Sequence, residues 1–152
     1  MSVLRSIYQG AVAAGWQPFD CQHGEQRWMP KESLAFCRPE TPYCGVIFAR
    51  PDARMSMNDI LDFQIRSLPH GLRVCWLLDH VPNVKFRHVA MVRLIDEEWV
   101  KMPGERPMLV AEFVEQALLD WPEFSDRLTG KTAAPQLYPP VNRRQSQFRL
   151  AS

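Results

Sequence analysis

Hydrophobic positions between residues 43 and 81 follow the pattern of a strand, a helix and a second strand. The apolar runs 44–49 and 72–78 have the length of buried strands, and a polar turn closes each of them. Between the two runs, apolar residues recur every three or four positions, which is typical of one face of a helix. Such a unit can supply two parallel strands joined by a right-handed crossover, and we expect the fold to be organised around it.

The helix inside this unit has signals at both ends. Ser56 is placed to act as the N-cap, and Asp59, three residues later, can bond back to the cap. Pro69 cannot continue a helix, and Gly71 suits the turn that follows it. The predicted apolar face of the helix consists of Met57, Ile60, Leu61, Ile65 and Leu68.

The rest of the chain predicts two further helices and several strands. Residues 2–14 carry an apolar stripe of helical period, and residues 107–121 carry another, opened by Pro107 at its first turn. Short or alternating apolar segments predict strands at 26–29, 33–37, 85–95 and 99–102. We therefore expect an α+β or α/β fold, in which a mixed sheet of about five to six strands is flanked by about three helices.

Composition is ordinary for a globular protein, with 152 residues, 46% hydrophobic residues and a net charge of +1. This low charge argues against duplex DNA in bulk as the main partner, although a local basic patch is compatible with it. No apolar run approaches the roughly 18 residues needed to cross a bilayer, and the N-terminus lacks the pattern of a signal peptide. We expect a cytoplasmic protein that is not bound to a membrane, and the sequence makes no prediction of its oligomeric state.

Residues 131–152 differ from the rest, so we divide the chain into a domain at 1–130 and a tail at 131–152. The tail holds four basic residues and no acid, which leaves 14 basic and 17 acidic residues in the remainder. Its prolines and polar residues are typical of a flexible, solvated segment. Alternatively, the tail folds onto a partner, with Tyr138 or Phe148 as the anchor and Arg143, Arg144 and Arg149 as the attracting charges.

The four cysteines allow two interpretations. Cys75 lies inside an apolar run and is most simply a small core residue. Scattered free thiols are the favoured interpretation for the others, because a reducing compartment disfavours disulfides. The alternative is a zinc site, since tetrahedral zinc takes four such ligands, although the spacing here is wider than in tight knuckles. Its candidate ligands are Cys21, His23, Cys37 and Cys44.

Candidate catalytic groups follow the two strands of the central unit. If these strands are parallel, their C-terminal ends share one edge of the sheet, where ligands of open α/β sheets tend to bind. Asp52 and Arg54 would lie at one strand end, and Asp79 and His80 at the other. Two carboxylates and an imidazole can bind a divalent metal or perform acid–base chemistry. The simpler interpretation, which we favour, is that the aspartates cap turns.

The segment Arg50–Ser56, the helix after it and the strand opened by Gly71 together resemble the second half of the core of restriction-endonuclease-like nucleases. The resemblance covers about 35 residues and depends on the pattern of elements. It implies an acid-x-lysine pair on the first strand, where the acid holds a metal and the lysine assists the attacking water. That strand reads Gly-Val-Ile-Phe-Ala-Arg over residues 45–50 and contains neither an acid nor a lysine.

The sequence also lacks a glycine-rich phosphate loop and a nucleophile elbow. We therefore favour a small, non-enzymatic interaction or regulatory module that binds a protein partner and needs no cofactor. The expected binding residues are Arg143, Arg144, Phe148, Arg149 and Arg54. Nucleic acid is a possible partner through Arg54 and the basic tail. The alternative is a divergent nuclease-like or other metal-dependent enzyme that acts on nucleic acid and uses Asp52, Asp79 and His80.

Overall fold

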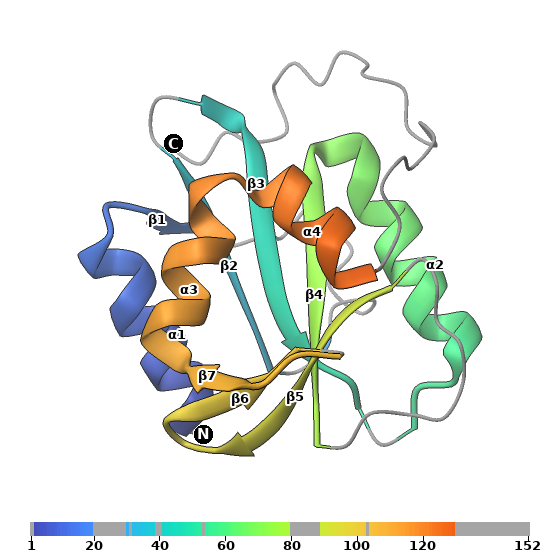
Figure 1. The fold of residues 1–152 in the computed structure, drawn as a ribbon. Coiled ribbons are helices and arrows are strands. Elements are labelled where there is room, and N and C mark those ends of the chain that lie inside the picture. The colour runs from blue at the N-terminus through green and yellow to red at the C-terminus, as the bar shows by residue number, and fades with distance from the viewer. Residues whose placement is uncertain are drawn as a thin grey trace.

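The structure is a computed structural model that describes residues 2–19, 30, 32–38, 41–52, 54–79, 89–102 and 104–129. Within these residues seven strands form one sheet, and their order across the sheet is their order along the chain (Figure 1). The strands are β1 (Gln17–Phe19), β2 (Glu32–Arg38), β3 (Thr41–Arg50), β4 (Leu72–Leu78), β5 (Ala90–Asp96), β6 (Trp99–Lys101) and β7 (Pro107–Leu109).

Helices cover both faces of the sheet. On one face lie α1 (Ser2–Ala13), α3 (Val110–Leu119) and α4 (Trp121–Thr129), and on the other lies α2 (Met57–Ser67), followed by the 3₁₀ turn η2 (Leu68–His70). The strands β3, β4 and β5 pair in parallel, whereas the outer pairs on both sides are antiparallel. This mixed sheet confirms the predicted α+β class and the parallel strands of the central unit.

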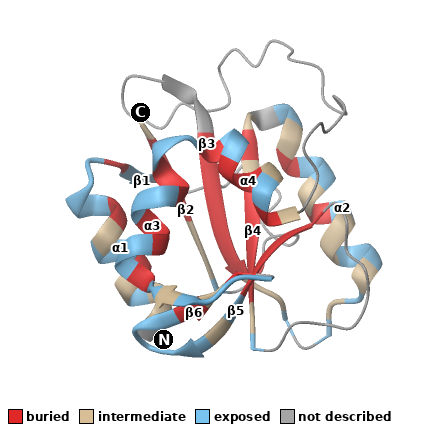
Figure 2. Ribbon diagram, in the orientation of Figure 1, coloured by how far each residue is buried: buried red, intermediate tan, exposed pale blue. Residues whose placement is uncertain are grey.

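Two separate apolar cores result from the alternation of side chains along the central strands. Val46 and Phe48 of β3 face α1, α3 and α4, whereas Ile47 and Ala49 face α2. The residues of β4 divide in the same way, and residues 45–49 of β3 and most of β4 are buried (Figure 2). A strand buried on both faces reads as a continuous apolar run, which explains the pattern of residues 44–49 and 72–78.

Gly45 allows β3 to lie close to its two neighbours, β2 and β4. A Cβ atom at this position would lie 2.8 Å from Leu72 Cδ2 and 2.8 Å from the carbonyl oxygen of Phe36. Both distances are shorter than real Cβ contacts, and one of the two neighbours is backbone that cannot move alone. Only glycine therefore fits at this position of β3, between β2 and β4.

The start of α2 is as predicted, but its buried side is not. Ser56 Oγ accepts from the N–H of Asp59 at 3.2 Å, and Asp59 Oδ2 accepts from the N–H of Ser56 at 2.9 Å. The fully buried apolar residue is Phe63, whereas Ile65 is 61% exposed. The assignment of Ile65 to the buried face was wrong, because it lies about 200° around the helix from Phe63.

The structure contains more elements than the sequence predicted. Residues 107–109 form β7 against β6, and α3 begins only at Val110, so the expectation of a helix from Pro107 was wrong. The strand β1 was not predicted, and residues 121–129 form a separate helix, α4. The predicted strand at 26–29 and the first part of the one at 85–95 lie outside the described residues. Among the residues described, no helix has both the length and the apolar character to cross a bilayer.

Candidate functional site

The C-terminal ends of β3 and β4 meet at one edge of the sheet and carry an ion-pair cluster. The parallel register pairs Ala49 with Trp76, so Asp79 lies two residues beyond the position opposite Arg50 and within reach of its side chain. Arg50 Nη2 donates to Asp79 Oδ1 at 2.9 Å, and Arg50 Nη1 lies 3.4 Å from Glu32 Oε1 on β2. We call these three residues the Arg50 cluster.

The Arg50 cluster is a solvated arrangement in which one guanidinium serves two carboxylates. Asp79 and Glu32 expose more than half of their side chains, so water screens their attraction to Arg50. Sequence reasoning placed Asp79 at this edge but missed Glu32. Its position follows from the antiparallel register that sets Glu32 opposite Arg50, and no local sequence signal carries that register.

The predicted metal or acid–base site at this edge stays a prediction. Asp52 and Arg54 are exposed beyond the end of β3, Asp79 is bonded to Arg50, and His80 lies outside the described residues. The described residues contain no group of three or more His, Cys, Asp or Glu side chains placed to hold a metal ion. The unit that carries the nuclease resemblance is indeed a parallel β3–α2–β4 unit, but its first strand has no acid-x-lysine pair.

The two cysteine side chains that the structure describes are buried, free thiols. Cys37 on β2 and Cys75 on β4 are inaccessible to solvent. Burial raises the pKa of the Cys37 thiol to about 11 and raises that of Cys75 further, so both stay protonated near neutral pH. Zinc binds the thiolate, and this burial therefore weighs against Cys37 as a ligand. Because Cys21 and His23 lie outside the described residues, the zinc site stays a prediction.

The outer face of β6 and β7 carries exposed apolar side chains. Trp99 and Leu109 are direct partners across these strands and are 39% and 38% exposed. Their neighbours Val100 and Met108 point the other way, into the core under α3, so Trp99 and Leu109 occupy the opposite face of the sheet. The core beneath α2 takes side chains from β2 to β5 and none from β6 or β7. Among the described residues, no helix packs on this part of the sheet.

Charged residues surround this apolar pair. The register sets Arg93 beside Lys101 and Lys101 beside Pro107 on the face that also carries Trp99 and Leu109. At the turn before β6, Asp96 Oδ1 accepts from the N–H groups of Glu98 and Trp99 at 2.9 and 3.0 Å. The exposed carboxylates of Glu97 and Glu98 lie in that turn. We call the surface made by Arg93, Trp99, Lys101, Pro107 and Leu109 the β6–β7 face.

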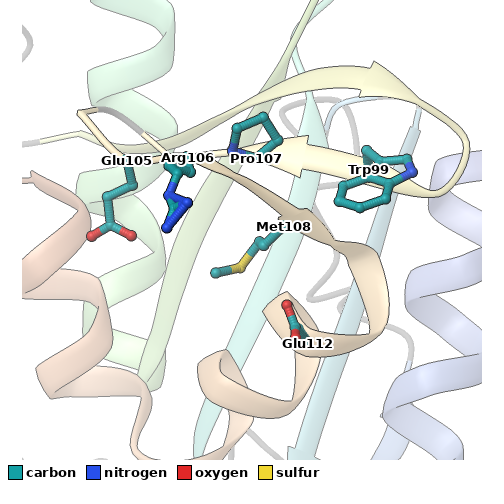
Figure 3. A pocket seen from close by; sticks show the side chains of 6 residues that line it. All are labelled: Trp99, Glu105, Arg106, Pro107, Met108 and Glu112. Atoms are coloured by element: carbon teal, nitrogen blue, oxygen red, sulfur yellow. The ribbon is translucent and has the colours of Figure 1, made fainter.

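A hollow of about 800 Å³ adjoins the β6–β7 face at the open edge of β7. Figure 3 shows Met108 of β7 and Arg106, just before this strand, directed toward it, with Glu112 of α3 below them and Trp99 at its border. Arg127 near the end of α4 lies 3.9 Å from Glu105, which also lines the hollow. The end of α4, where the described residues end, therefore lies close to the hollow. The tail residues Arg143, Arg144, Phe148 and Arg149 lie outside the described residues, so their binding role stays a prediction.

The class that these features define is an α+β domain with a parallel β3–α2–β4 centre and an exposed aromatic sheet face at one end. Comparison with protein-family models, with curated proteins and with solved structures finds no match to this chain. A functional proposal consequently depends on the surfaces of this chain alone.

Proposed function

We propose that this protein is a non-enzymatic interaction module and that it binds a protein partner through the β6–β7 face. The observation that carries the proposal is the cross-strand pair Trp99–Leu109, exposed on a part of the sheet that no described helix covers. Large apolar side chains held together on a rigid strand pair supply buried area on binding at little cost in side-chain freedom.

The composition of the face fits a protein interface. Tryptophan is the residue type most enriched among binding hot spots, and an apolar centre with a polar rim is the usual anatomy of such interfaces. Here the rim holds both signs of charge, with Arg93 and Lys101 on the strands and Glu97 and Glu98 in the adjoining turn. A polyanion would meet repulsion from this turn, so the mixed rim favours a protein partner over a nucleic acid.

The proposal is tested first by identifying what binds at the face. A photo-reactive amino acid placed at Lys101, next to Trp99 on β6, should cross-link the partner in extracts of the native host. The same group placed at Ile65 of α2 is the matched control and should not cross-link it, because α2 packs over β2 to β5 and Ile65 is on its exposed side.

The second step measures affinity for the identified partner with purified proteins. Trp99→Ala should weaken binding by about 30-fold, the loss expected for a hot-spot residue of roughly 2 kcal/mol, while Ile65→Ala should stay within about twofold. Both side chains are exposed, so neither change should unfold the domain. Equal binding by the native protein and by Trp99→Ala would remove the basis of the proposal.

A second candidate function is a metal-dependent enzyme that acts on nucleic acid at the edge with the Arg50 cluster. The observation in its favour is the parallel pairing of β3 and β4, which supports the predicted common edge for Asp52 and Asp79. Incubation of single- and double-stranded DNA and of RNA with Mg²⁺ or Mn²⁺ tests it. Cleavage that Asp79→Asn abolishes, and that Asp62→Asn on α2 retains, would support this candidate.

A further inference from the structure

The β6–β7 face is extended by a third exposed apolar side chain, that of Ile95 on β5. Leu94 packs on the core under α3, so Ile95, the next residue, is directed to the opposite side of the sheet, as Trp99 is. The register of β5 and β6 shifts at this point, so Ile95 and Asp96 both lie opposite Trp99. Seven large hydrophobic side chains are exposed in the described part of the chain, and three of them, those of Ile95, Trp99 and Leu109, gather here. A contiguous apolar patch of this kind is typical of an interface.

The open edge of β7 does not offer a complete set of main-chain groups to a further strand. The N–H of Val110 donates to the carbonyl oxygen of Glu98 at 2.9 Å, so the next hydrogen-bonded pair along these antiparallel strands is Val100 with Met108. The main-chain groups of Pro107 are therefore directed to the open edge, where proline has no N–H to donate. We consequently expect a partner to pack on the β6–β7 face and not to extend the sheet at β7.

The charges of this surface are separated by sign along β6. Arg93 and Lys101 are direct partners across β5 and β6, and like charges in this position repel each other. Within the described ranges neither of them forms an ion pair with a carboxylate. The exposed carboxylates of Glu97 and Glu98 lie at the other end of β6, beyond Trp99. The basic end and the acidic end of the surface are thus complementary to each other but are held apart in one molecule.

Twofold symmetry brings these opposite ends together. Trp99 lies midway between Glu97 and Lys101 along the chain. When two copies pack face to face with their β6 strands antiparallel about Trp99, Lys101 of each copy lies opposite Glu97 of the other. A symmetric contact makes every such pair twice, and the three apolar side chains of each copy meet at its centre.

We propose that the partner bound at the β6–β7 face is a second copy of this chain, in a symmetric dimer. The inference rests on the proposed function, because it names the partner of the same face. Its basis is the charge complementarity of the face with itself, together with the apolar patch between the two charged ends.

Sedimentation equilibrium of the purified full-length protein tests the dimer without any other protein present. We expect a reversible monomer–dimer equilibrium with a Kd on the order of 10 µM, as for a small interface. Trp99→Ala should weaken the association by at least about 30-fold, because the side chain contributes from both copies. Ile65→Ala, on the exposed side of α2, should stay within about twofold of the native protein.

Charge reversals test the twofold arrangement itself. Lys101→Glu and Glu97→Lys should each weaken self-association by at least about tenfold, because each sets like charges opposite one another twice in the dimer. An equimolar mixture of these two variants should associate about as tightly as the native protein, since both contacts then join opposite charges. Glu115→Lys makes the same change at an exposed position of α3 and should alter association by less than about twofold.

Three results would overturn the dimer: a protein that stays monomeric at about 1 mM, a dimer that Trp99→Ala leaves intact, or a mixture of the two charge variants that stays monomeric. A monomer whose Lys101 cross-links a different protein in extracts would overturn the dimer and leave the proposed function standing. No cross-link from Lys101 to any protein, this chain included, would count against the β6–β7 face as a whole.

Discussion

Replacement of Phe63 by alanine should strongly destabilise the domain, because this side chain holds α2 to the sheet. Phe63 is 2% exposed and packs edge-to-face on Trp76 of β4, with ring centroids 5.6 Å apart and an interplanar angle of 68°. Loss of a buried phenylalanine costs about 3–5 kcal/mol, of which the aromatic pair accounts for roughly 0.5–1.5 kcal/mol. A domain of this size has a total stability of only about 5–15 kcal/mol, so the loss is a large share of it.

Urea unfolding followed by circular dichroism measures this loss of stability, which is calculated from the midpoint and the slope of the unfolding transition. The matched control is Ile65→Ala, two residues away on the same helix and 61% exposed, which should change stability by less than about 0.5 kcal/mol. Leu61→Ala should fall between the two, toward the lower end of the 2–5 kcal/mol expected for a leucine, because Leu61 is only partly buried against this core. If Ile65→Ala were as costly as Phe63→Ala, the observed phase of α2 would be refuted.

Three further predictions concern the core, the thiols and the tail. Gly45→Ala should cost about 1–3 kcal/mol through overpacking, whereas Gly10→Ala in α1, where a Cβ atom would lie 3.4 Å from Val114, should be neutral or slightly stabilising in the same unfolding assay. The pKa of the Cys37 thiol is about 11 in the fold and 9.0 in its ordinary state, so the unfolded chain loses this proton first and stability should fall above pH 9. Cys37→Ala should make this decline shallower in chemical denaturation, and the part that remains should come from Cys75, whose thiol pKa burial also raises. A chain that ends at residue 130 should keep the melting temperature of the full chain but bind the partner more weakly at low ionic strength; an unchanged affinity would contradict the predicted role of residues 131–152.

Local signals in the sequence predicted the centre of the fold well. The capping box at Ser56 and Asp59 depends on residues three apart. Residues 45–49 and most of 72–78 are buried on both faces, so the apolar pattern of these runs needs no knowledge of the rest of the chain. The parallel pairing of the two strands then followed from the length of the crossover between them.

Features that depend on contacts between distant segments could not be predicted in the same way. Pro107 suits the first turn of a helix as well as the start of an edge strand, and only its pairing with Lys101 decides for the strand. Glu32 joins the Arg50 cluster through strand register, which leaves no local trace.

Amide hydrogen exchange with and without the bound protein partner tests the central proposal most directly. Binding at the β6–β7 face predicts slower exchange in residues 93–101 and 107–109, with no change in α2. Protection confined to α2, or to the edge that carries Arg50 and Asp79, would contradict a partner site at Trp99 and Leu109.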